Sequence, residues 1–233
     1  MAVDTSKTYD FNPYGRELIL EALARIGVRP TEITQQHMYH ARMSANMVLS
    51  EWSNTQPNLW EVGLQQVPLI QGFATYSMPA ETVTILDAYI TYNLGTDSTL
   101  TTDRYIQPIS RTEYASYPNK SQQGFPTVYW FDRTISPQVT LWMVPDGNGP
   151  YILKYYSVRQ TQDFKNENTA EVPYRFLDAF VSALAWRLSQ KFAPALEPRL
   201  QALAERAWAL ASTQDVENNN IYIVPGISGY YNW

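Results

Sequence analysis

Cysteine is absent from the 233-residue sequence, and histidine occurs only twice. The lack of cysteine excludes disulfide bonds, thiolate nucleophiles and zinc sites with sulfur ligands, and it is consistent with assembly in a reducing cytoplasm. Glycine-rich phosphate loops of the Walker or dinucleotide-binding spacing are also missing, and the segment GISGY lacks the strand-to-helix setting of a nucleophile elbow. The sequence therefore predicts none of the common nucleotide-dependent or thiol-dependent enzymes.

An excess of positive charge and long apolar runs are lacking as well. The 22 acidic residues outnumber the 17 basic ones, and the net charge of -5 is unlike the basic footprint of a protein that reads a DNA groove. The residues MAVDTSKTYDFNPYG do not have the basic and then apolar pattern of a secretory signal. We therefore expect no sequence-specific DNA binding, no membrane partner and no secretion.

Aromatic and other apolar residues, by contrast, are plentiful. Hydrophobic residues make up 45% of the chain and charged residues 17%, with 17 Tyr and 7 Trp. A chain of this length buries roughly 70% of its unfolded surface, which is enough for one large domain or two small ones. Because Tyr and Trp carry a polar group on an apolar ring, they suit wet interfaces as well as cores.

The first 57 residues carry two helical patterns. The first helix is expected to have Asn12 as its cap, Pro13 at its first helical position and Gly27 as its stop. A second helix is expected from about Thr31 to Ser53, with apolar residues at three- or four-residue spacing. Its expected apolar side consists of Ile33, Ala41, Ala45, Val48 and Trp52, widened by Met38, Met43 and Met47. The short connection predicts antiparallel neighbours.

From Leu59 to about Phe164, segments rich in β-branched and aromatic residues alternate with turn residues, which predicts antiparallel β structure. Strands are expected near residues 60–68, 74–78, 82–93, 126–132, 138–144 and 150–157. The clearest hairpin signal is QVTLWMVPDGNGPYILKYYSV, with residues 145–149 as the turn. A short helix is expected over residues 111–117, because Ser110 and Glu113 have the spacing of a capping box.

Helical periodicity returns near residue 172. One apolar stripe recurs every fourth residue and consists of Phe176, Phe180, Leu184, Leu188 and Phe192. Pro194 and Pro198 separate this helix from a final one at about 197–214. The residues of the final helix expected to face inward are Leu200, Leu203, Ala207 and Leu210.

The predicted fold class is α+β: a discontinuous antiparallel bundle of two N-terminal and two C-terminal helices, with an inserted antiparallel β-rich region and an extended C-terminal arm. The expected boundaries are 1–57 for the N-terminal helices, 58–171 for the β-rich insertion, 172–215 for the C-terminal helices and 216–233 for the arm.

Few side chains suggest catalysis or metal binding. His37 and His40 lie three apart, but no cysteine or third histidine completes a metal site, so a structural or surface role is favoured and no metal or cofactor is expected. Glu51 and Glu61 flank Trp52 and Trp60, which a glycosidase cleft could use, although 22 acidic residues make such a pair unsurprising. The aromatic residues Tyr129, Trp130, Trp142, Tyr155 and Tyr156 are candidates for sugar stacking or for the two faces of a sheet.

The segment NNNIYIVPGISGYYNW, residues 218–233, is the strongest candidate binding element. Its large apolar side chains would promote aggregation unless a protein surface covered them, and the segment is too interrupted for a membrane span. The run of asparagines is expected to end the last helix, and residues 221–224 would suit strand addition to a partner's sheet edge. The alternative is that the segment folds back on the chain's own helices.

The order and spacing of several segments resemble the head-to-tail adaptor proteins of short-tailed bacteriophages, also called tail accessory factors or connector proteins. The segments are GRELILEALARIGV, LSEWSNTQPNLW, QGFATYSMPAET, ISRTEYASYPNKSQQGFPTVYWFDR, LWMVPD and EVPYRFLDAFVSALAWRLSQKFAP, and they span nearly the whole chain. They are packing and turn patterns, not catalytic motifs.

The resemblance implies a structural virion protein that is not an enzyme, assembled in the bacterial host cytoplasm. It implies a twelve-fold ring of identical copies beneath the portal protein, which extends the DNA channel, lets genomic DNA pass without sequence specificity and carries the tail nozzle or tail fibres. It also implies that the C-terminal arm binds the portal, through the expected anchors Ile221, Tyr222, Ile223, Val224, Pro225, Tyr230, Tyr231 and Trp233. Two alternatives stay open: peptidoglycan hydrolase activity of a tail protein, and a carbohydrate-binding β module.

Overall fold

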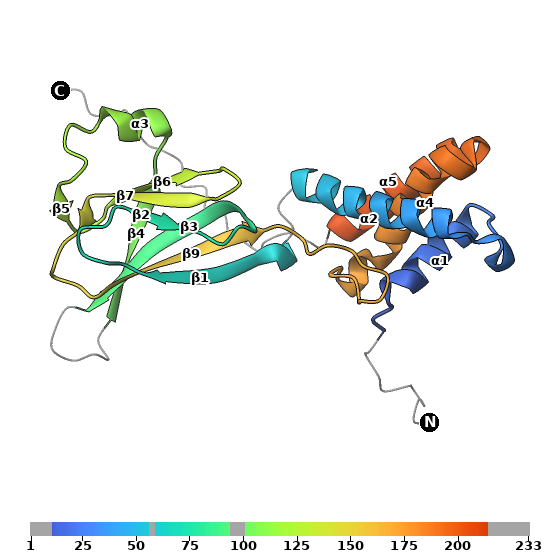
Figure 1. Cartoon of the computed structure of the whole chain (residues 1–233), viewed down its shortest axis with the longest axis horizontal. Helices are drawn as coiled ribbons and strands as arrows, with labels where there is room; N and C mark the ends of the chain where they lie inside the picture. The colour runs from blue at the N-terminus through green and yellow to red at the C-terminus, as the bar shows by residue number, and fades with distance from the viewer. Residues whose placement is uncertain (1–10, 56–58, 94–100, 214–233) are drawn as a thin grey trace, which may run out of the picture.

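The computed structural model describes residues 11–55, 59–93 and 101–213. Figure 1 shows a helical part at one end of an elongated molecule and a β-rich part at the other, joined where α2 leads into β1 and where β9 leads back toward α4. The described residues contain five α-helices and one seven-stranded sheet, so the predicted α+β class is confirmed.

The helical part contains four of the helices, from both ends of the described sequence. They are α1 (Gly15–Arg25), α2 (Gln35–Thr55), α4 (Leu177–Phe192) and α5 (Glu197–Ser212). Short 3-10 turns lie at Pro30–Glu32, Leu59–Glu61, Tyr174–Phe176 and Pro194–Leu196. Residues 31–53, expected as one helix, are therefore divided between a 3-10 turn and α2.

The start of α1 differs from the prediction. The helix begins at Gly15 with Tyr14 as its N-cap, and the Glu17 carboxylate accepts a hydrogen bond from the Tyr14 backbone N–H at 2.8 Å. Gly15 donates its backbone N–H to the Asn168 carbonyl at 2.8 Å, and a Cβ at this position would lie 2.2 Å from the Lys165 carbonyl oxygen. The close approach of the chain before α4 thus requires glycine and moves the helix start beyond Asn12 and Pro13.

One hydrophobic cluster joins the N-terminal and C-terminal helices. In α4 and the turn before it, Phe176, Phe180, Leu184 and Leu188 are completely buried, as the four-residue periodicity predicts, while Phe192 is half-buried. They share this cluster with Leu23 from α1 and with residues of α2 and α5. The cluster also contains Ala22, Ala41, Ala45, Val48, Trp52, Leu200 and Ala211.

The predicted buried faces of α5 and α2 are wrong at four residues. In α5, Leu200 is buried, but Leu203 and Leu210 are exposed, and Trp208 instead packs on Trp52 with ring centres 4.6 Å apart. In α2, Met43 and Met47 are exposed. An indole fills far more of the core than a leucine side chain, and its packing turns the α5 leucines toward solvent.

The seven-stranded sheet has the order β1-β9-β3-β4-β6-β7-β2. The strands are β1 (Val62–Pro68), β2 (Thr75–Ser77), β3 (Thr82–Asn93), β4 (Thr101–Pro108), β6 (Val128–Asp132), β7 (Gln138–Trp142) and β9 (Tyr151–Arg159). A second, two-stranded sheet pairs β5 (Gln123–Gly124) with β8 (Val144–Pro145). The β4 strand was not predicted.

The predicted hairpin over residues 138–157 is wrong, although both of its strands exist. β7 pairs with β6 and β2, whereas β9 lies between β1 and β3. A turn does form within residues 145–149, in which the Asp146 carboxylate accepts a hydrogen bond from the Asn148 backbone N–H at 3.0 Å. The long β3 offers β9 nine paired positions, and the connection therefore leads to another part of the sheet.

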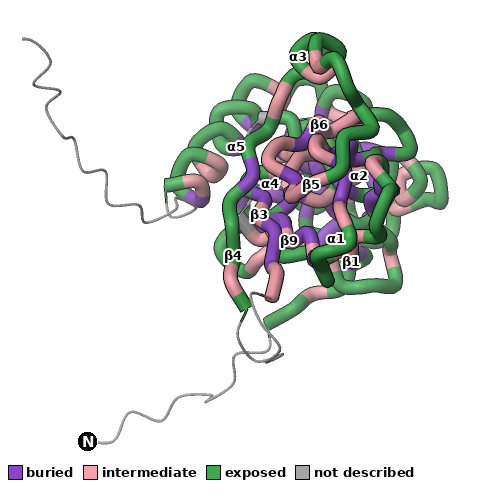
Figure 2. Tube along the Cα trace, turned by 90° about the vertical axis from the view of Figure 1, so that its left-hand side faces the viewer, coloured by how far each residue is buried: buried purple, intermediate pink, exposed green. Residues whose placement is uncertain are grey.

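The sequence predicted a purely antiparallel β-rich part, and this prediction is wrong in two places. β4 pairs with β6 in parallel, and so does β5 with β8. The sheet curls around a second hydrophobic cluster that includes Ala88, Ile90, Ile106, Tyr129, Leu141, Leu153 and Tyr155. In Figure 2 the buried segments of this end lie in the interior and are surrounded by exposed chain.

Helix α3 (Arg111–Ser116) lies on the β-rich part, between β4 and β6 in sequence, close to its predicted place. The Ser110 hydroxyl accepts a hydrogen bond from the Glu113 backbone N–H at 3.1 Å, which confirms the predicted N-cap. The ring of Tyr114 stacks on Trp130, with centres 5.8 Å apart, and fixes the helix to the sheet.

Candidate assembly surfaces

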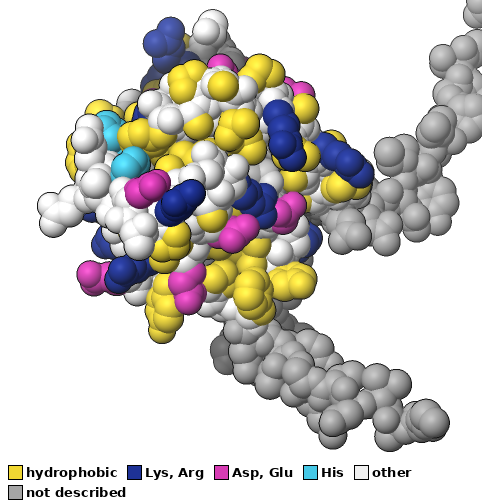
Figure 3. All heavy atoms as spheres, turned by 90° about the vertical axis from the view of Figure 1, so that its right-hand side faces the viewer, with side chains coloured by type: hydrophobic (Ala, Val, Ile, Leu, Met, Phe, Trp, Pro, Cys, Tyr) yellow, Lys and Arg dark blue, Asp and Glu magenta, His cyan; other side chains and the backbone are white. Residues whose placement is uncertain are grey.

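The predicted portal-binding residues, from Ile221 to Trp233, lie outside the described residues. Their role stays a prediction. The β-rich part exposes single large hydrophobic side chains such as Phe73 and Ile135. The helical part, which Figure 3 views end-on, has several hydrophobic patches with charged side chains between them.

An apolar groove of about 650 Å³ lies between α1 and the start of α4. Its floor includes Leu18, Leu177 and Val181, which are buried, while Phe11 and Tyr174 stand at its edge with their rings in edge-to-face contact. Tyr174 is 76% exposed although its ring is large and apolar. Large exposed rings beside a hollow are typical of a contact surface.

Arg25 of α1 links the two helices that border this groove. Its guanidinium donates to Asp178 at 2.7 Å, to the Ser182 hydroxyl at 2.7 Å and to Glu21 at 3.3 Å. Glu17 also lines the groove, so three carboxylates lie around an apolar floor, with Arg25 and Arg175 as the cationic groups. The groove therefore favours an apolar ligand surface that carries positive charge.

A second hollow, of about 290 Å³, continues on the other side of Arg25. It is lined by Arg25, Leu196, Arg199, Leu200 and Leu203. Leu203 and Leu210 are both exposed on α5, seven residues apart, and so lie on the same side of that helix. We call the two hollows together, with the side of α5 that carries Leu203, the α1–α4–α5 groove.

Helix α2 presents a separate apolar stripe to solvent. Tyr39, Met43 and Met47 recur every fourth residue, with side chains 56%, 39% and 51% exposed. Arg42 lies beside the stripe, its guanidinium carbon 6.0 Å from the centre of the Tyr39 ring. Since a helix on the surface of a monomer normally turns polar residues to solvent, this stripe is a candidate contact surface.

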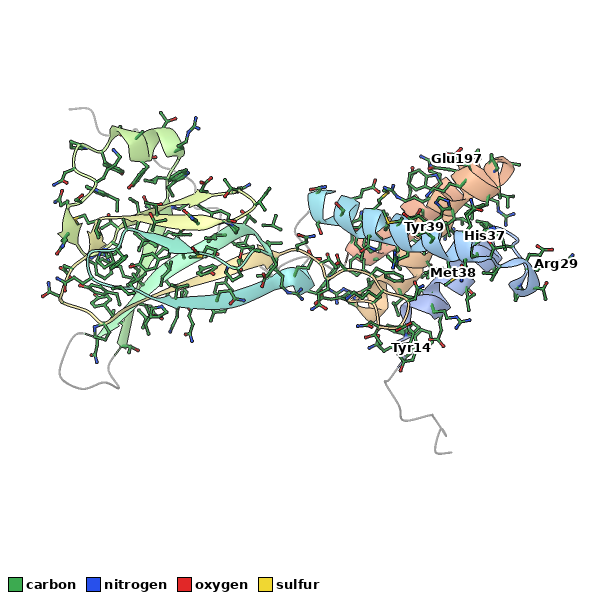
Figure 4. All side chains as sticks on the ribbon, viewed as in Figure 1. Tyr14, Arg29, His37, Met38, Tyr39 and Glu197 are labelled. Atoms are coloured by element: carbon green, nitrogen blue, oxygen red, sulfur yellow. The ribbon has the colours of Figure 1, made fainter. Side chains whose placement is uncertain are left out.

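The two histidines have structural neighbours. His37 accepts a hydrogen bond from the Thr34 backbone N–H through Nδ1 at 3.1 Å, and its ring centre lies 4.5 Å from that of Phe192. His40 also contacts the Phe192 ring. Within residues 11–55, 59–93 and 101–213, no group of three or more His, Cys, Asp or Glu side chains could hold a metal ion. Figure 4 shows His37 beside Met38 and Tyr39 on α2.

The two carboxylates considered for catalysis occupy different environments. Glu51 is half-exposed and forms an ion pair with Arg187 of α4. Glu61 is completely buried and accepts a hydrogen bond from the Thr161 hydroxyl, at the junction of the helical and β-rich parts. Trp52 lies in the helical core and Trp60 packs against it, with its ring centre 4.6 Å from that of Phe176. Both indoles thus support the core, and Trp52 also lines a hollow of about 210 Å³ together with Glu51.

The aromatic residues of the β-rich part are divided between core and surface. Tyr129 and Tyr155 are buried in the sheet cluster, and burial raises the pKa of Tyr129 to about 12. Trp142 stacks on Tyr117 with ring centres 4.2 Å apart and donates its indole N–H to the Asn119 carbonyl at 2.9 Å. Tyr156 remains 41% exposed. Most of these rings therefore have partners within the chain.

Sequence reasoning missed both described surfaces. The exposure of Met43, Met47, Leu203 and Leu210 contradicts their assignment to core faces. One feature of the sequence does indicate these surfaces: in each helix the apolar residues cover more of the circumference than one buried side needs. In α2, for example, Ala41 and Ala45 already belong to the buried side, so Met43 and Met47 face solvent.

Comparison with protein families matches residues 16–225 to the family described as SU10 adaptor protein. The chain belongs to this family. The match begins in α1 and includes every later helix and strand that the structure describes. It confirms the resemblance to adaptor proteins, while the restriction to short tails stays a prediction.

The other comparisons add little to the adaptor family. No curated protein matches the chain. Among solved structures, a chain in "Neck of empty GTA particle computed with C6 symmetry" is 10% identical, with 81% of this chain and 87% of that chain covered and a TM-score of 0.25. Among the described residues, no helix is long and apolar enough to cross a membrane.

Proposed function

We propose that this protein is a head-to-tail adaptor of a tailed-phage virion, with a short tail as the specific case. In this proposal its copies form a twelve-fold ring beneath the portal, extend the DNA channel and provide the docking platform for the tail nozzle or fibres. The observation that carries the proposal is the match to the adaptor family over residues 16–225. Assembly takes place in the host cytoplasm, where the copies form the ring on the portal of the filled head.

The surfaces of the helical part support a role in assembly. A ring subunit must contact its two neighbours through different faces, and the α1–α4–α5 groove and the α2 stripe are two separate apolar surfaces. The net charge of -5 suits a channel that lets DNA slide, because a cationic wall would hold phosphates. In this role the protein needs no catalytic residues, cofactor or metal.

The parts of the chain have separate tasks in this proposal. Residues 1–57 and 172–215 form one antiparallel helical bundle against the portal and the sister subunits, and residues 58–171 form the β-rich outer or lower part of the ring. Residues 216–233 form the arm that reaches along the portal. The shared cluster of α1, α2, α4 and α5 supports the first of these assignments.

Deletion of residues 219–233 tests the arm and the portal partner together. The truncated protein should keep its circular dichroism spectrum and melting temperature but no longer co-purify with the portal, because the large apolar anchors are removed. Replacement of Asn219 and Asn220 by Ser is the matched control and should leave portal binding unchanged. A truncated protein that binds the portal normally would defeat the arm assignment.

Electron microscopy of the full chain mixed with its portal tests the ring. A closed ring of twelve copies under the portal is expected. Portal particles that carry no added ring, at adaptor concentrations well above those used for co-purification, would contradict the proposed function.

A further inference from the structure

We propose that neighbouring copies in the ring pack side by side, with α2 of one copy lying in the α1–α4–α5 groove of the next. The contact on one side is the stripe of Tyr39, Met43 and Met47, and on the other the groove around Arg25. This inference rests on the proposed ring and names the surfaces that form it. The occupant of the groove is a second copy of this chain.

The two surfaces lie on opposite sides of α4. On one side, Arg187 and Lys191 of α4 contact α2, through Glu51 and through the Ser44 hydroxyl. On the other side, Asp178 and Ser182 of α4 bind Arg25 of α1. Nine residues separate Asp178 from Arg187 and Ser182 from Lys191, which is a rotation of about 180° around a helix.

Because the α2 stripe and the groove lie on opposite sides of the helical part, contact between them would build a ring and not a dimer. The α2 stripe turns away from α4, because its buried side, with Ala41, Ala45 and Val48, faces the helical core. A contact between opposite, different faces repeats from copy to copy and closes into a ring if the rotation allows. A contact of one face with itself would stop at a dimer.

Charge favours the α2 stripe as the occupant of the groove. Residues 35–50 of α2 contain no Asp or Glu, and they include Arg42 and both histidines. The groove presents the carboxylates of Glu17, Glu21 and Asp178 around its apolar floor. Three cations also line the groove: Arg25 is paired with Glu21 and Asp178, Arg175 lies over the rings of Trp60 and Phe176, and Arg199 lines the second hollow. The complementarity is therefore local, between the guanidinium of Arg42 and the carboxylates around Arg25.

The shapes of the side chains also agree. The three stripe residues extend over about 12 Å of helix at 1.5 Å per residue, and two of them are methionines, whose flexible side chains fill irregular hollows. The floor of the groove supplies Leu18, Leu177 and Val181, and its edge supplies Leu203. Each side would therefore cover apolar surface that the single chain leaves in water.

The absence of cysteine from the sequence makes crosslinking a direct test. A variant with both Met43→Cys and Glu21→Cys, assembled on its portal and treated with a short bismaleimide, should form a ladder of dimers, trimers and larger species. The Met43→Cys and Glu21→Cys single variants should each give no dimer alone, and their mixture should stop at a dimer. Both positions are exposed, so the variants should fold as the parent does.

Matched controls make the outcome decisive. Pairing Met43→Cys with Ile135→Cys, which is 97% exposed on the β-rich part, should give no ladder. A dimer from Met43→Cys alone would show α2 contacting α2 and would overturn the inference. An absent ladder from the Met43→Cys and Glu21→Cys variant, with portal binding intact, would overturn the interface but leave the proposed function standing.

A charge reversal gives a second, independent readout. Arg42→Glu should lower the fraction of portal particles that carry a complete ring at least tenfold, and Glu21→Arg in the same chain should restore part of it. Arg111→Glu, on the exposed side of α3, is the control and should have no effect. Equal loss of rings in the Arg111→Glu and Arg42→Glu variants would contradict the assignment of Arg42 to the contact.

Discussion

Phe180 offers a test of whether the helical and β-rich parts unfold independently. Its ring is completely buried, with its centre 6.0 Å from that of Trp52 and 5.4 Å from that of Phe164. The helical cluster and the sheet cluster have no residue in common. Phe180→Ala should therefore cost about 3–5 kcal/mol in the helical part alone, from lost burial and the cavity left behind.

Hydrogen exchange followed by mass spectrometry measures the two parts separately. At about 1.4 kcal/mol per factor of ten, amides of α4 should exchange on the order of 10³-fold faster in Phe180→Ala, while amides of β9 should be unchanged. Leu141→Ala, in the sheet cluster, should cost about 2–5 kcal/mol and give the reverse pattern. Ile135→Ala, on the exposed surface, should change neither part.

Equal loss of protection in α4 and β9 after Phe180→Ala would refute this reasoning. That result would mean that the junction couples the two clusters into one cooperative unit. Contacts that could provide such coupling include the hydrogen bond between the Ser53 and Thr161 hydroxyls, at 3.3 Å, and the hydrogen bond from the Thr161 hydroxyl to the buried Glu61 carboxylate.

Three smaller changes test local interactions. Ser110→Ala removes the N-cap of α3 and should destabilise that helix by about 0.5–2 kcal/mol, seen as faster amide exchange in residues 111–116. The hydrogen bond from Arg159 lowers the pKa of Glu171 below its usual value of 4.5. The stability that the ionised Glu171 contributes is therefore present above pH 4.5 and is lost as the pH falls further. Glu171→Gln should make the urea midpoint of unfolding less dependent on pH in this acid range. Burial, and then the hydrogen bond to Asp146, raise the pKa of Tyr151 to about 12, so the stability that this residue contributes is complete below pH 10 and is lost as the pH rises toward 12. Tyr151→Phe should lower the free energy of unfolding by about 1 kcal/mol at neutral pH. It should also remove one tyrosine that ionises near pH 12 from the ultraviolet titration.

Features with a local cause were predictable from the sequence. The Ser110 cap and the apolar stripe from Phe176 to Leu188 each depend on residues three or four positions apart in one helix, and both are present in the structure. Most strands were found because alternation and turn residues are also local signals. The β4 strand escaped detection because its sequence, TTDRYIQP, is mainly polar and six of its eight residues are exposed.

Features that depend on distant partners were not predictable in the same way. β9 pairs with β3 and β1 instead of β7, and its partners in β1 lie up to 96 residues away in the sequence (Val62 opposite Val158). The turn residues around Asp146 carry no information about such distant partners. The side of α5 that faces the core was decided by Trp208 against Trp52, from the other end of the described chain. The portal-binding residues of the arm stay a prediction from the sequence and its resemblance to adaptor proteins.

The sequence by itself determined the α+β class, the positions of most helices and strands, and the resemblance to adaptor proteins, because periodicity, caps and turn residues act within a few positions of one another. Only the tertiary structure decided which apolar side chains are left in water. Burial depends on which helix covers which, so Met43 and Leu203 became candidate contacts between copies only once α4 and its neighbours had filled the core.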